Sequence, residues 1–551
     1  MSKRWLVMYE VSQKQRYIFR SNRLRENIGA STIIRWLTDE PERFFEKWNV
    51  RMPRPLHKSV GGGSALYVFE SSDDAAVFAN ELSLGVLKHL PGLELFLVTD
   101  SMDWETDRLY ASDGAAAGGR ANVLEDMRNK LAAKKNRRAH AVRQYTWGIH
   151  CLCPDSGMPA NEYAELPGDS DKVARARELN VKDGYGRMTL DDFDNRFITG
   201  LEYAPANGQK LKFMDQDYLE RVLGGERSAK NYVAIVHLDG NAMGTKVSAF
   251  QKISFSGNDE YLEQYARFTE KIDQAYTNAM RKTIEHVMHN YGRWAGKIYG
   301  DSEEKQYAHT NVIPLRPIVA SGDDVSFISI GQMGIETARI FIQFLQKESM
   351  EIDGAPFRFD ACAGVAIVRR KFPFWLAYEL AERLCGNAKK RLKQESKLWR
   401  TAGLGDGDQP FEASLIDWEI AASGDVELNV DQRREHVFRT GDGYLHNRPY
   451  YLFRDATDNQ YIHPSNYMTG FLHAVDSIQK SKMGRSKWKS LRSVYHQGRT
   501  AVEQWFVQNR FETGQPHYVN VPNREGEVSA YFYDAIEVMD HMIHLGEVNA
   551  E

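Results

Sequence analysis

The chain has 551 residues, of which 42% are hydrophobic and 26% charged, and a formal net charge of −4. This length exceeds a single hydrophobic core, so two to four domains are expected. The near-neutral charge excludes nucleic-acid binding through the overall field of the protein. Four cysteines exclude a disulfide scaffold and favour a reducing, cytoplasmic location. No signal peptide and no apolar stretch of membrane-spanning length is found, so no membrane contact is expected.

Residues 1–149 are predicted to form one domain with the order β-α-β-β-α-β, as in ferredoxin-like folds. The expected elements are a strand at 5–11, a long helix with apolar residues from 18 to 37, a strand at 65–69, a helix at 75–90 and a strand at 93–99. A glycine hairpin, Gly61-Gly62-Gly63-Ser64, precedes the second of these strands, and Ser71–Asp74 is a typical helix start.

Residues 231–424 repeat this order, which indicates a divergent internal duplication. The expected elements are a strand at 232–238, helices at about 259–291, a hairpin at 318–330, a helix at 333–350, a strand at 358–368 and a helix at 374–393. The first domain has no carboxylate pair at its hairpin, and its first strand ends in Glu10-Val11-Ser12. We therefore expect the second domain to be catalytic and the first to be non-catalytic.

Two further segments complete the predicted organisation. Residues 150–230 are polar and turn-rich and are interpreted as a connecting insertion, while residues 425–551 are interpreted as a C-terminal helical domain. His150-Cys151-Leu152-Cys153 provides half of a metal site, but the second cysteine pair that zinc needs is absent. The predicted fold class is thus α+β, with two ferredoxin-like palm domains and a C-terminal helical domain.

Three aspartates are the candidate catalytic and metal-binding residues. Asp239 follows a buried-strand pattern, and Asp323 and Asp324 lie at the turn of a predicted hairpin. Either motif alone is more often just a turn, but their conjunction in a β-α-β-β order favours a palm, where carboxylates of neighbouring strands converge. Adjacent carboxylates repel each other and persist where a divalent cation neutralises them. The hard oxygen ligands favour two Mg²⁺ or Mn²⁺ ions over zinc.

Other residues are candidates for nucleotide binding. Gly240, Asn241 and Gly244 could turn backbone N–H groups toward a triphosphate, as could Ser321 and Gly322 in the hairpin, although glycine turns are common. Lys389 and Lys390 lie on a late helix that can reach phosphates in a palm, and a solvated basic helix end explains them equally well. Basic clusters at 130–143 and 480–492 could contact RNA or a protein, but solvated helix faces are the commoner explanation.

The ordered set of motifs resembles the CRISPR polymerase family, the large subunit of type III CRISPR effector complexes, whose second palm carries a Gly-Gly-Asp-Asp hairpin. The resemblance covers most of residues 5–420. Its segments include Gln15-Arg16-Tyr17-Ile18-Phe19, Ile28-Gly29-Ala30-Ser31, Gly61-Gly62-Gly63-Ser64, Asp239-Gly240-Asn241-Ala242-Met243-Gly244, Ser321-Gly322-Asp323-Asp324 and Asn387-Ala388-Lys389-Lys390. Further segments are Tyr9-Glu10-Val11-Ser12, Asn22-Arg23-Leu24-Arg25-Glu26, Cys153-Pro154 with Gly157-Met158-Pro159-Ala160, Ala361-Cys362-Ala363-Gly364-Val365-Ala366-Ile367 and Ala377-Tyr378-Glu379-Leu380-Ala381-Glu382.

The resemblance implies a synthase that makes cyclic oligoadenylate from ATP as a second messenger in antiviral defence. The second palm would hold the metal-bound donor ATP, and the first palm would help hold the acceptor through Gly29, Ser31, Gly62 and Gly63. Other type III CRISPR subunits, with guide RNA and target RNA, are the implied partners.

The sequence departs from the family in three ways. The chain begins at the first palm without an HD nuclease domain, so DNase activity is not expected. The zinc ribbon between the palms is degenerate, and Ser321 replaces the first glycine of the hairpin. The alternatives are a scaffold subunit that binds the CRISPR ribonucleoprotein and target RNA without turnover, a stand-alone cyclic-nucleotide synthase of another defence system and, last, a diguanylate-type cyclase.

Overall fold

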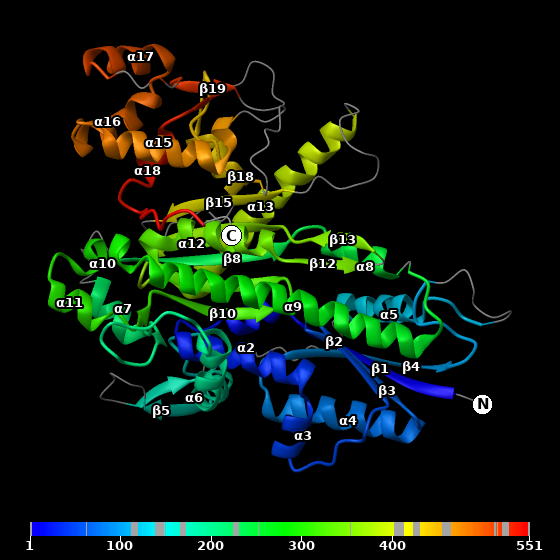
Figure 1. The fold of residues 1–551 in the computed structure, drawn as a ribbon. Helices are drawn as coiled ribbons and strands as arrows, with labels where there is room; N and C mark the ends of the chain where they lie inside the picture. Colours follow the sequence, from blue (N-terminus) through cyan, green and yellow to red (C-terminus); the bar gives the residue numbers. More distant parts are fainter. Residues whose placement is uncertain are drawn as a thin grey trace.

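Two sheet-and-helix units and a C-terminal segment are stacked in the computed structural model, with the N-terminal unit below and the C-terminal segment above (Figure 1). The structure describes residues 3–61, 63–111, 119–137, 148, 150–165, 172–223, 231–251, 253–352, 354–401, 413–421, 430–453, 464–511, 514, 516–520 and 528–548. None of the described helices combines the length and the hydropathy needed to cross a bilayer.

The first unit has the predicted β-α-β-β-α-β order. Its elements are β1 (Lys3–Ser12), α1 (Lys14–Ile18), α2 (Leu24–Asp39), α3 (Glu42–Lys47), β2 (His57–Gly61), β3 (Ser64–Phe69), α4 (Ser72–His89), β4 (Glu94–Asp103) and α5 (Val123–Arg137). The strands form an antiparallel sheet in the order β2-β3-β1-β4. The Ser71 side chain accepts a hydrogen bond from the Asp74 N–H and caps α4, as its helix-start pattern predicts.

The long helix expected after β1 is broken into α1 and α2. The chain leaves the helix after Ile18, and the Phe19 ring stacks on Tyr378 of the second unit, with centroids 3.8 Å apart. The Ser21 hydroxyl then accepts the Arg23 N–H as α2 begins. Helical spacing could not reveal this break, because the residues that cause it contact a distant part of the chain.

The second unit repeats the order on a larger scale. Its elements are β8 (Tyr232–Gly240), α8 (Met243–Gln251), α9 (Asn258–His289), α10 (Tyr291–Tyr299), α11 (Glu303–Ala308), β9 (Val312–Ile313), β10 (Leu315–Ser321), β11 (Asp324–Ile330), η1 (Gly331–Met333), α12 (Gly334–Lys347), β12 (Ser349–Ile352), β13 (Ala355–Arg358), β14 (Ala361–Arg369), α13 (Phe374–Thr401) and β15 (Ser414–Ala421). The sheet order is β10-β11-β8-β14-β15-β18, and its first four strands follow the order of the first unit.

The connecting segment contains β5 (Glu162–Glu165), β6 (Lys172–Arg175), α6 (Arg177–Ile198), β7 (Lys212–Phe213) and α7 (Gln216–Leu223). The fully buried Arg175 ties this segment to α2. Its guanidinium donates to Asp155 Oδ2 at 2.9 Å, to Glu26 Oε1 at 2.5 Å and to Asn180 Oδ1 at 2.9 Å. Next to it, Cys153 is buried in an apolar cluster with Ala176 and Leu179, whereas Cys151 is exposed.

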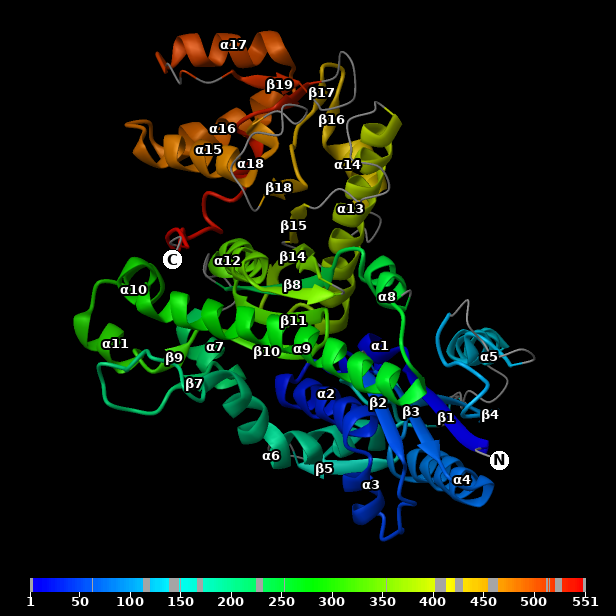
Figure 2. The ribbon, with the colours of Figure 1, turned by 45° about the vertical axis from the view of Figure 1, so that its right-hand side comes forward.

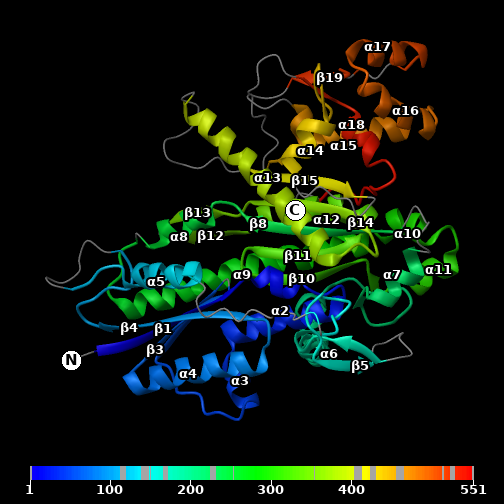
Figure 3. The ribbon, with the colours of Figure 1, turned by 180° about the vertical axis from the view of Figure 1, so that it is seen from behind.

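The C-terminal segment mixes helices with short strands. It contains α14 (Val430–Val437), β16 (Arg439–Thr440), β17 (Gly443–Tyr444), β18 (Tyr450–Leu452), η2 (Pro464–Asn466), α15 (Met468–Lys480), α16 (Arg485–Tyr495), α17 (Arg499–Gln508), β19 (Tyr518–Asn520), β20 (Val528–Ala530) and α18 (Tyr533–Glu537). The small sheet β16-β17-β20-β19 was not foreseen, because its strands are two or three residues long. β18 joins the sheet of the second unit through β15, and α13 extends toward this segment (Figure 3).

The two units contact each other reciprocally. Helix α2 of the first unit packs on β10 of the second, and helix α9 of the second packs on β2 of the first (Figure 2). Since α2 and α9, like β2 and β10, occupy matching places in the repeated order, the contact resembles the interface of a two-fold symmetric dimer.

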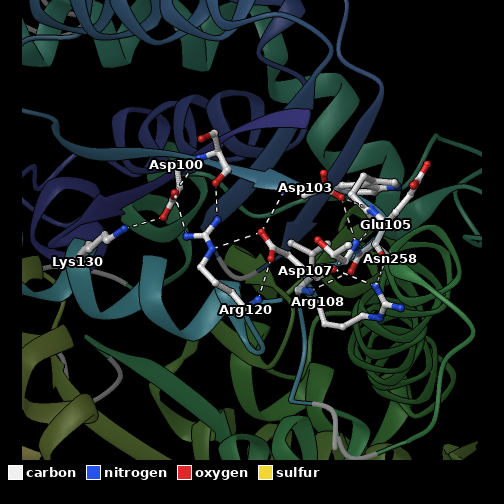
Figure 4. A network of polar contacts seen from close by, with 12 residues as sticks. Asp100, Asp103, Glu105, Asp107, Arg108, Arg120, Lys130 and Asn258 are labelled. Carbon is white, nitrogen blue, oxygen red and sulfur yellow. Dashed lines mark hydrogen bonds and ion pairs between the residues drawn. The ribbon is translucent and has the colours of Figure 1, made fainter. Parts of the chain in front are cut away.

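The buried Asn258 fixes one end of this interface. At the start of α9 its side chain accepts the Leu109 N–H and donates to the carbonyls of Trp104 and Asp107, on the loop that follows β4 (Figure 4). Asp107 is held in turn by Arg120.

We predict that Gly29→Ala destabilises the protein. A Cβ at Gly29 would lie 2.0 Å from the Lys182 carbonyl oxygen and 2.6 Å from the Gly186 nitrogen on α6, so α2 and α6 would have to separate. The expected cost is on the order of 3 kcal/mol, measured by thermal unfolding. Gly184→Ala, on α6 but facing open space, is the control and should be neutral or gain about 0.5 kcal/mol. Equal stability of the two variants would contradict this packing.

Candidate metal and nucleotide site

The three predicted aspartates lie together where β8 meets the β10–β11 hairpin. Asp239 and Asp324 are direct partners in the pairing of β8 with β11. Gly322, with φ of 61°, makes the turn, and the Gly240 N–H donates to the Asp323 carbonyl at 3.2 Å. The tight hairpin therefore brings Asp323 next to the other two residues.

Lys389 supplies a positive charge to this cluster. From α13, its Nζ lies 2.5 Å from Asp239 Oδ2 and donates to the Gly240 carbonyl at 2.9 Å. Burial alone would lower the pKa of Lys389, but the Asp239 carboxylate outweighs it and the pKa is raised. The ammonium thus stays charged and acts as a counter-ion for Asp239. Lys390, the next residue, is exposed.

The surroundings of Asp323 disfavour its charged form. Burial, and then the nearby Asp239 and Asp324 carboxylates, raise the pKa of Asp323 to about 6, against a smaller opposing effect of Lys389. The buried Tyr276 of α9 lies close by, since its hydroxyl would be 2.6 Å from a Cβ at Gly240. Burial and then Asp323 and Asp239 raise the pKa of Tyr276.

Asp324 is held from both units. Its Oδ2 accepts a hydrogen bond of 2.7 Å from Gln15 Nε2 on α1, and its Oδ1 lies 3.6 Å from His237 Nδ1. This Oδ1 is buried and has no hydrogen-bond partner among the described residues. A buried carboxylate oxygen without a donor is a position at which a cation would be favourable.

The donor chemistry of the cluster fits Mg²⁺ or Mn²⁺. All three side chains offer hard oxygens, their mutual repulsion raises the pKa of Asp323, and one Asp324 oxygen lacks a partner. Across the described residues, no three His, Cys, Asp or Glu side chains are arranged so that they could already hold a metal ion. Lys389 and Gln15 occupy oxygens of Asp239 and Asp324 instead. Metal binding to that oxygen of Asp239 would therefore require Lys389 to move, whereas Asp324 Oδ1 has no donor bound to it among the described residues.

The loop after β8 has a mixed role. A Cβ at Gly240 would also lie 2.9 Å from Asp323 Cβ, so the site requires glycine there. Asn241 is buried, and it donates to the carbonyls of Asp360 and Ala413, which fixes the loop. Gly244 begins α8 beside open space. Of these three residues, Gly244 alone leaves room for a ligand next to its Cα.

The candidates of the first unit lie in different places. Ser31 lines a cavity of about 30 Å³ together with Gln15, Ser321 and Asp324. This volume holds one water molecule rather than a nucleoside. Gly29 is buried against α6 and serves helix packing. Gly63, with φ of 82°, lies against Lys14, while Gly62 is outside the described residues.

The first unit keeps a reduced copy of the site. Glu10 pairs with Ser64 at the register positions of Asp239 and Asp324. Lys135 Nζ lies 2.8 Å from Glu10 Oε1, so this lysine contacts Glu10 as Lys389 contacts Asp239. The aspartate pair itself is replaced by Gly63 and Ser64. Within the described hairpin residues, the first unit thus has one carboxylate where the second has three.

The basic clusters are partly neutralised. Lys130 pairs with Asp100, and in the second cluster Lys480 pairs with Asp476, Arg485 and Lys489 with Asp540, and Arg492 with Glu537. These pairs reduce the positive field that an RNA backbone would require.

Sequence reasoning missed Gln15, His237 and Tyr276 as neighbours of the site. His237 had a readable signal, because a polar residue in an apolar strand, two positions before Asp239, lies on the same face of the sheet. Gln15 and Tyr276 had none, since their proximity depends on how α1 and α9 pack.

Solved structures show the same fold. A chain of a Csm1–Csm4 cassette in complex with AMPPNP matches 99% of this chain and 70% of its own length, at 11% identity and a TM-score of 0.50. A chain of a Csm1–Csm4 cassette in complex with cA4 matches 98% of this chain and 70% of its own length, at 12% identity and a TM-score of 0.50. A further cassette, in complex with cA3, matches 71% of this chain and 53% of its own, at 12% identity and a TM-score of 0.40. This chain thus spans about half to 70% of the length of these solved chains.

The sequence itself has no recognisable relative in two other comparisons. No protein-family model matches it, and no curated protein matches it. The solved Csm1–Csm4 structures, however, confirm the predicted α+β class and, at the level of the fold, the resemblance to the CRISPR polymerase family.

We predict that Asp323→Asn stabilises the metal-free protein above pH 6. Because burial and the neighbouring carboxylates raise the pKa of Asp323 from 3.8 to about 6, its charged form costs folding free energy that an amide does not. In EDTA at pH 8 the variant should gain about 2 kcal/mol, and the gain should shrink below pH 6 and vanish near pH 4. Thermal unfolding across this pH range measures it, with the exposed Asp301→Asn as control. A gain that grows with falling pH would contradict the assignment.

Proposed function

We propose that the second unit is a Mg²⁺-dependent nucleotidyltransferase that converts ATP to cyclic oligoadenylate in antiviral defence of the CRISPR type. The observation that carries the proposal is the direct cross-strand pairing of Asp239 with Asp324, with Asp323 beside them at the hairpin turn. The solved complexes of the same fold with AMPPNP and with cA4 support ATP as the substrate and a cyclic adenylate as the product.

The chemistry follows from the placement of these residues. Two Mg²⁺ ions, held by Asp239, Asp323 and Asp324, would activate an attacking hydroxyl and neutralise charge on the transferred phosphate. A ribose hydroxyl of the acceptor attacks the α-phosphorus of ATP, the bond to the β-phosphate oxygen breaks, and pyrophosphate leaves. Lys389, which contacts Asp239, would be free to bind a phosphate of the donor once metal ions neutralise that carboxylate. Gly244, at the start of α8, leaves room for phosphates.

The acceptor nucleotide would bind on the side of the first unit, near Ser31 and the Gly62-Gly63 hairpin. Since the cavity between Ser31 and Ser321 holds a single water, acceptor binding would require the two units to separate slightly there. The solved cassettes with cA4 and AMPPNP pair Csm1 with Csm4, which supports a partner subunit of this kind for this chain. Guide RNA and target RNA are further partners in the proposal. A stand-alone synthase is the alternative, and activity of the purified chain without partners would favour it.

The hairpin aspartates are predicted to be essential for turnover. Purified protein incubated with ATP and Mg²⁺ or Mn²⁺ should form linear or cyclic adenylate, detected by mass spectrometry. The Asp323→Asn, Asp324→Asn double variant should lose product by more than 1000-fold, on the order expected when a metal-dependent step is disabled. Asp301→Asn is the charge-matched control. Full activity of the double variant would exclude this site as the catalytic centre.

The two neighbouring lysines are predicted to differ. Lys389→Met removes a charged donor that contacts the site, so kcat/KM for ATP should fall about ten- to hundredfold, the value of one charge-assisted hydrogen bond. Lys390→Met makes the same chemical change one residue away, at an exposed position, and should stay within about threefold. Steady-state kinetics of both variants measure the difference, and equal losses would show that Lys389 has no special role.

A further inference from the structure

One hydrogen bond crosses from the first unit into the candidate metal site of the second. Gln15, on α1, donates its Nε2–H to Asp324 Oδ2 at 2.7 Å. The other oxygen, Oδ1, faces His237, which itself interacts with the Ser326 hydroxyl at 3.0 Å. The first unit therefore orients one oxygen of Asp324 and leaves the second oxygen without a donor.

The chemistry of this contact suits a positioning role. Asp239 is the direct cross-strand partner of Asp324, so repulsion between the two carboxylates acts to turn Asp324 away from Asp239. The Gln15 amide holds the Asp324 carboxylate in one orientation, yet it is uncharged and leaves the negative charge of Asp324 intact for a cation. Lys389 differs, because its ammonium neutralises Asp239.

The position of Gln15 is fixed by the docking of the two units. Four residues further along the chain, the Phe19 ring stacks on Tyr378, with centroids 3.8 Å apart, and on Phe374 at 5.6 Å. The Phe374 N–H also donates to Asn22 Oδ1 at 2.8 Å. These contacts hold the segment that directly follows α1 against α13, the helix that carries Lys389. The orientation of Asp324 and the seating of the first unit on the second are thus mechanically linked.

We propose that Gln15 is a positioning residue for the metal site, through which the first unit controls the metal affinity of the second. The proposal rests on the proposed function, in that Asp324 is taken to bind a metal ion. It gives the non-catalytic unit a direct role: any change that shifts α1 on α13 withdraws the hydrogen bond and weakens the site.

The test measures Mn²⁺ binding to the full-length chain without nucleotide, by the loss of the free Mn²⁺ signal in electron paramagnetic resonance. Gln15→Met preserves the length of the side chain but removes the N–H donor. Its dissociation constant for Mn²⁺ should rise about tenfold, the typical effect of removing a partner of a metal ligand. Arg16→Met makes the same replacement at the exposed neighbouring residue and should bind Mn²⁺ as the wild type does. Asp324→Asn is the positive control, because it removes the charge of a proposed metal ligand and should weaken Mn²⁺ binding.

A second variant tests the link to docking. Phe19→Leu loosens the stack on Tyr378 while keeping an apolar side chain, and it should weaken Mn²⁺ binding about threefold. The Gln15→Met, Phe19→Leu double variant should bind no more weakly than Gln15→Met alone, because both changes act through one hydrogen bond. Additive losses would show that Phe19 acts on the site by another route, and would overturn the link to docking.

The outcomes separate this proposal from the proposed function. If Asp324→Asn weakens Mn²⁺ binding while Gln15→Met stays within twofold of the wild type, the positioning role is wrong and the metal site stands. An equal loss in Arg16→Met would also overturn it, as a nonspecific effect. If Asp324→Asn binds Mn²⁺ as tightly as the wild type, Asp324 is not a ligand, and both the proposed function and the role of Gln15 fall.

Discussion

Repulsion among three carboxylates is the constraint around which the candidate site is built. The pairing of β8 with β11 places Asp239 opposite Asp324, and the turn at Gly322 adds Asp323, so their charges meet at one sheet edge. The surroundings of the three residues differ: Lys389 neutralises Asp239, Gln15 hydrogen-bonds Asp324, and burial together with the neighbouring carboxylates raises the pKa of Asp323. Such an arrangement costs folding free energy in the absence of a cation and is typical of functional sites.

The repeated order of the two units explains how the site has partners from both of them. In the reciprocal packing, the long helices α2 and α9 each lie on the other unit. This packing places α1 beside the hairpin of the second unit. The first unit retains Glu10 and Lys135 at the places of Asp239 and Lys389, but its hairpin carries Gly63 and Ser64 instead of aspartates. One unit thus has the three carboxylates, while the other has the same strand order without the aspartate pair.

The sequence predicted the order of both units, the hairpin and the three aspartates, because strand periodicity and turn residues are local signals. It did not predict the break between α1 and α2, which depends on the stacking of Phe19 on a residue more than 350 positions away. For the same reason it missed Gln15 and Tyr276. The small C-terminal sheet escaped because its strands are too short to show alternation. Gly29, a candidate for nucleotide binding, lies in the tight crossing of α2 and α6, which explains why glycine is needed there.

The buried Arg175 has a practical consequence for work on this protein. Its guanidinium links the turn around Cys153, through Asp155, to Glu26 of α2 and Asn180 of α6. This is the place where the sequence has half of a zinc motif. An ion pair of this kind requires neither a bound metal nor a particular thiol oxidation state. Strong chelators should therefore leave this segment attached to α2 and α6, so that the effect of divalent ions on the candidate site can be measured without unfolding this part of the chain.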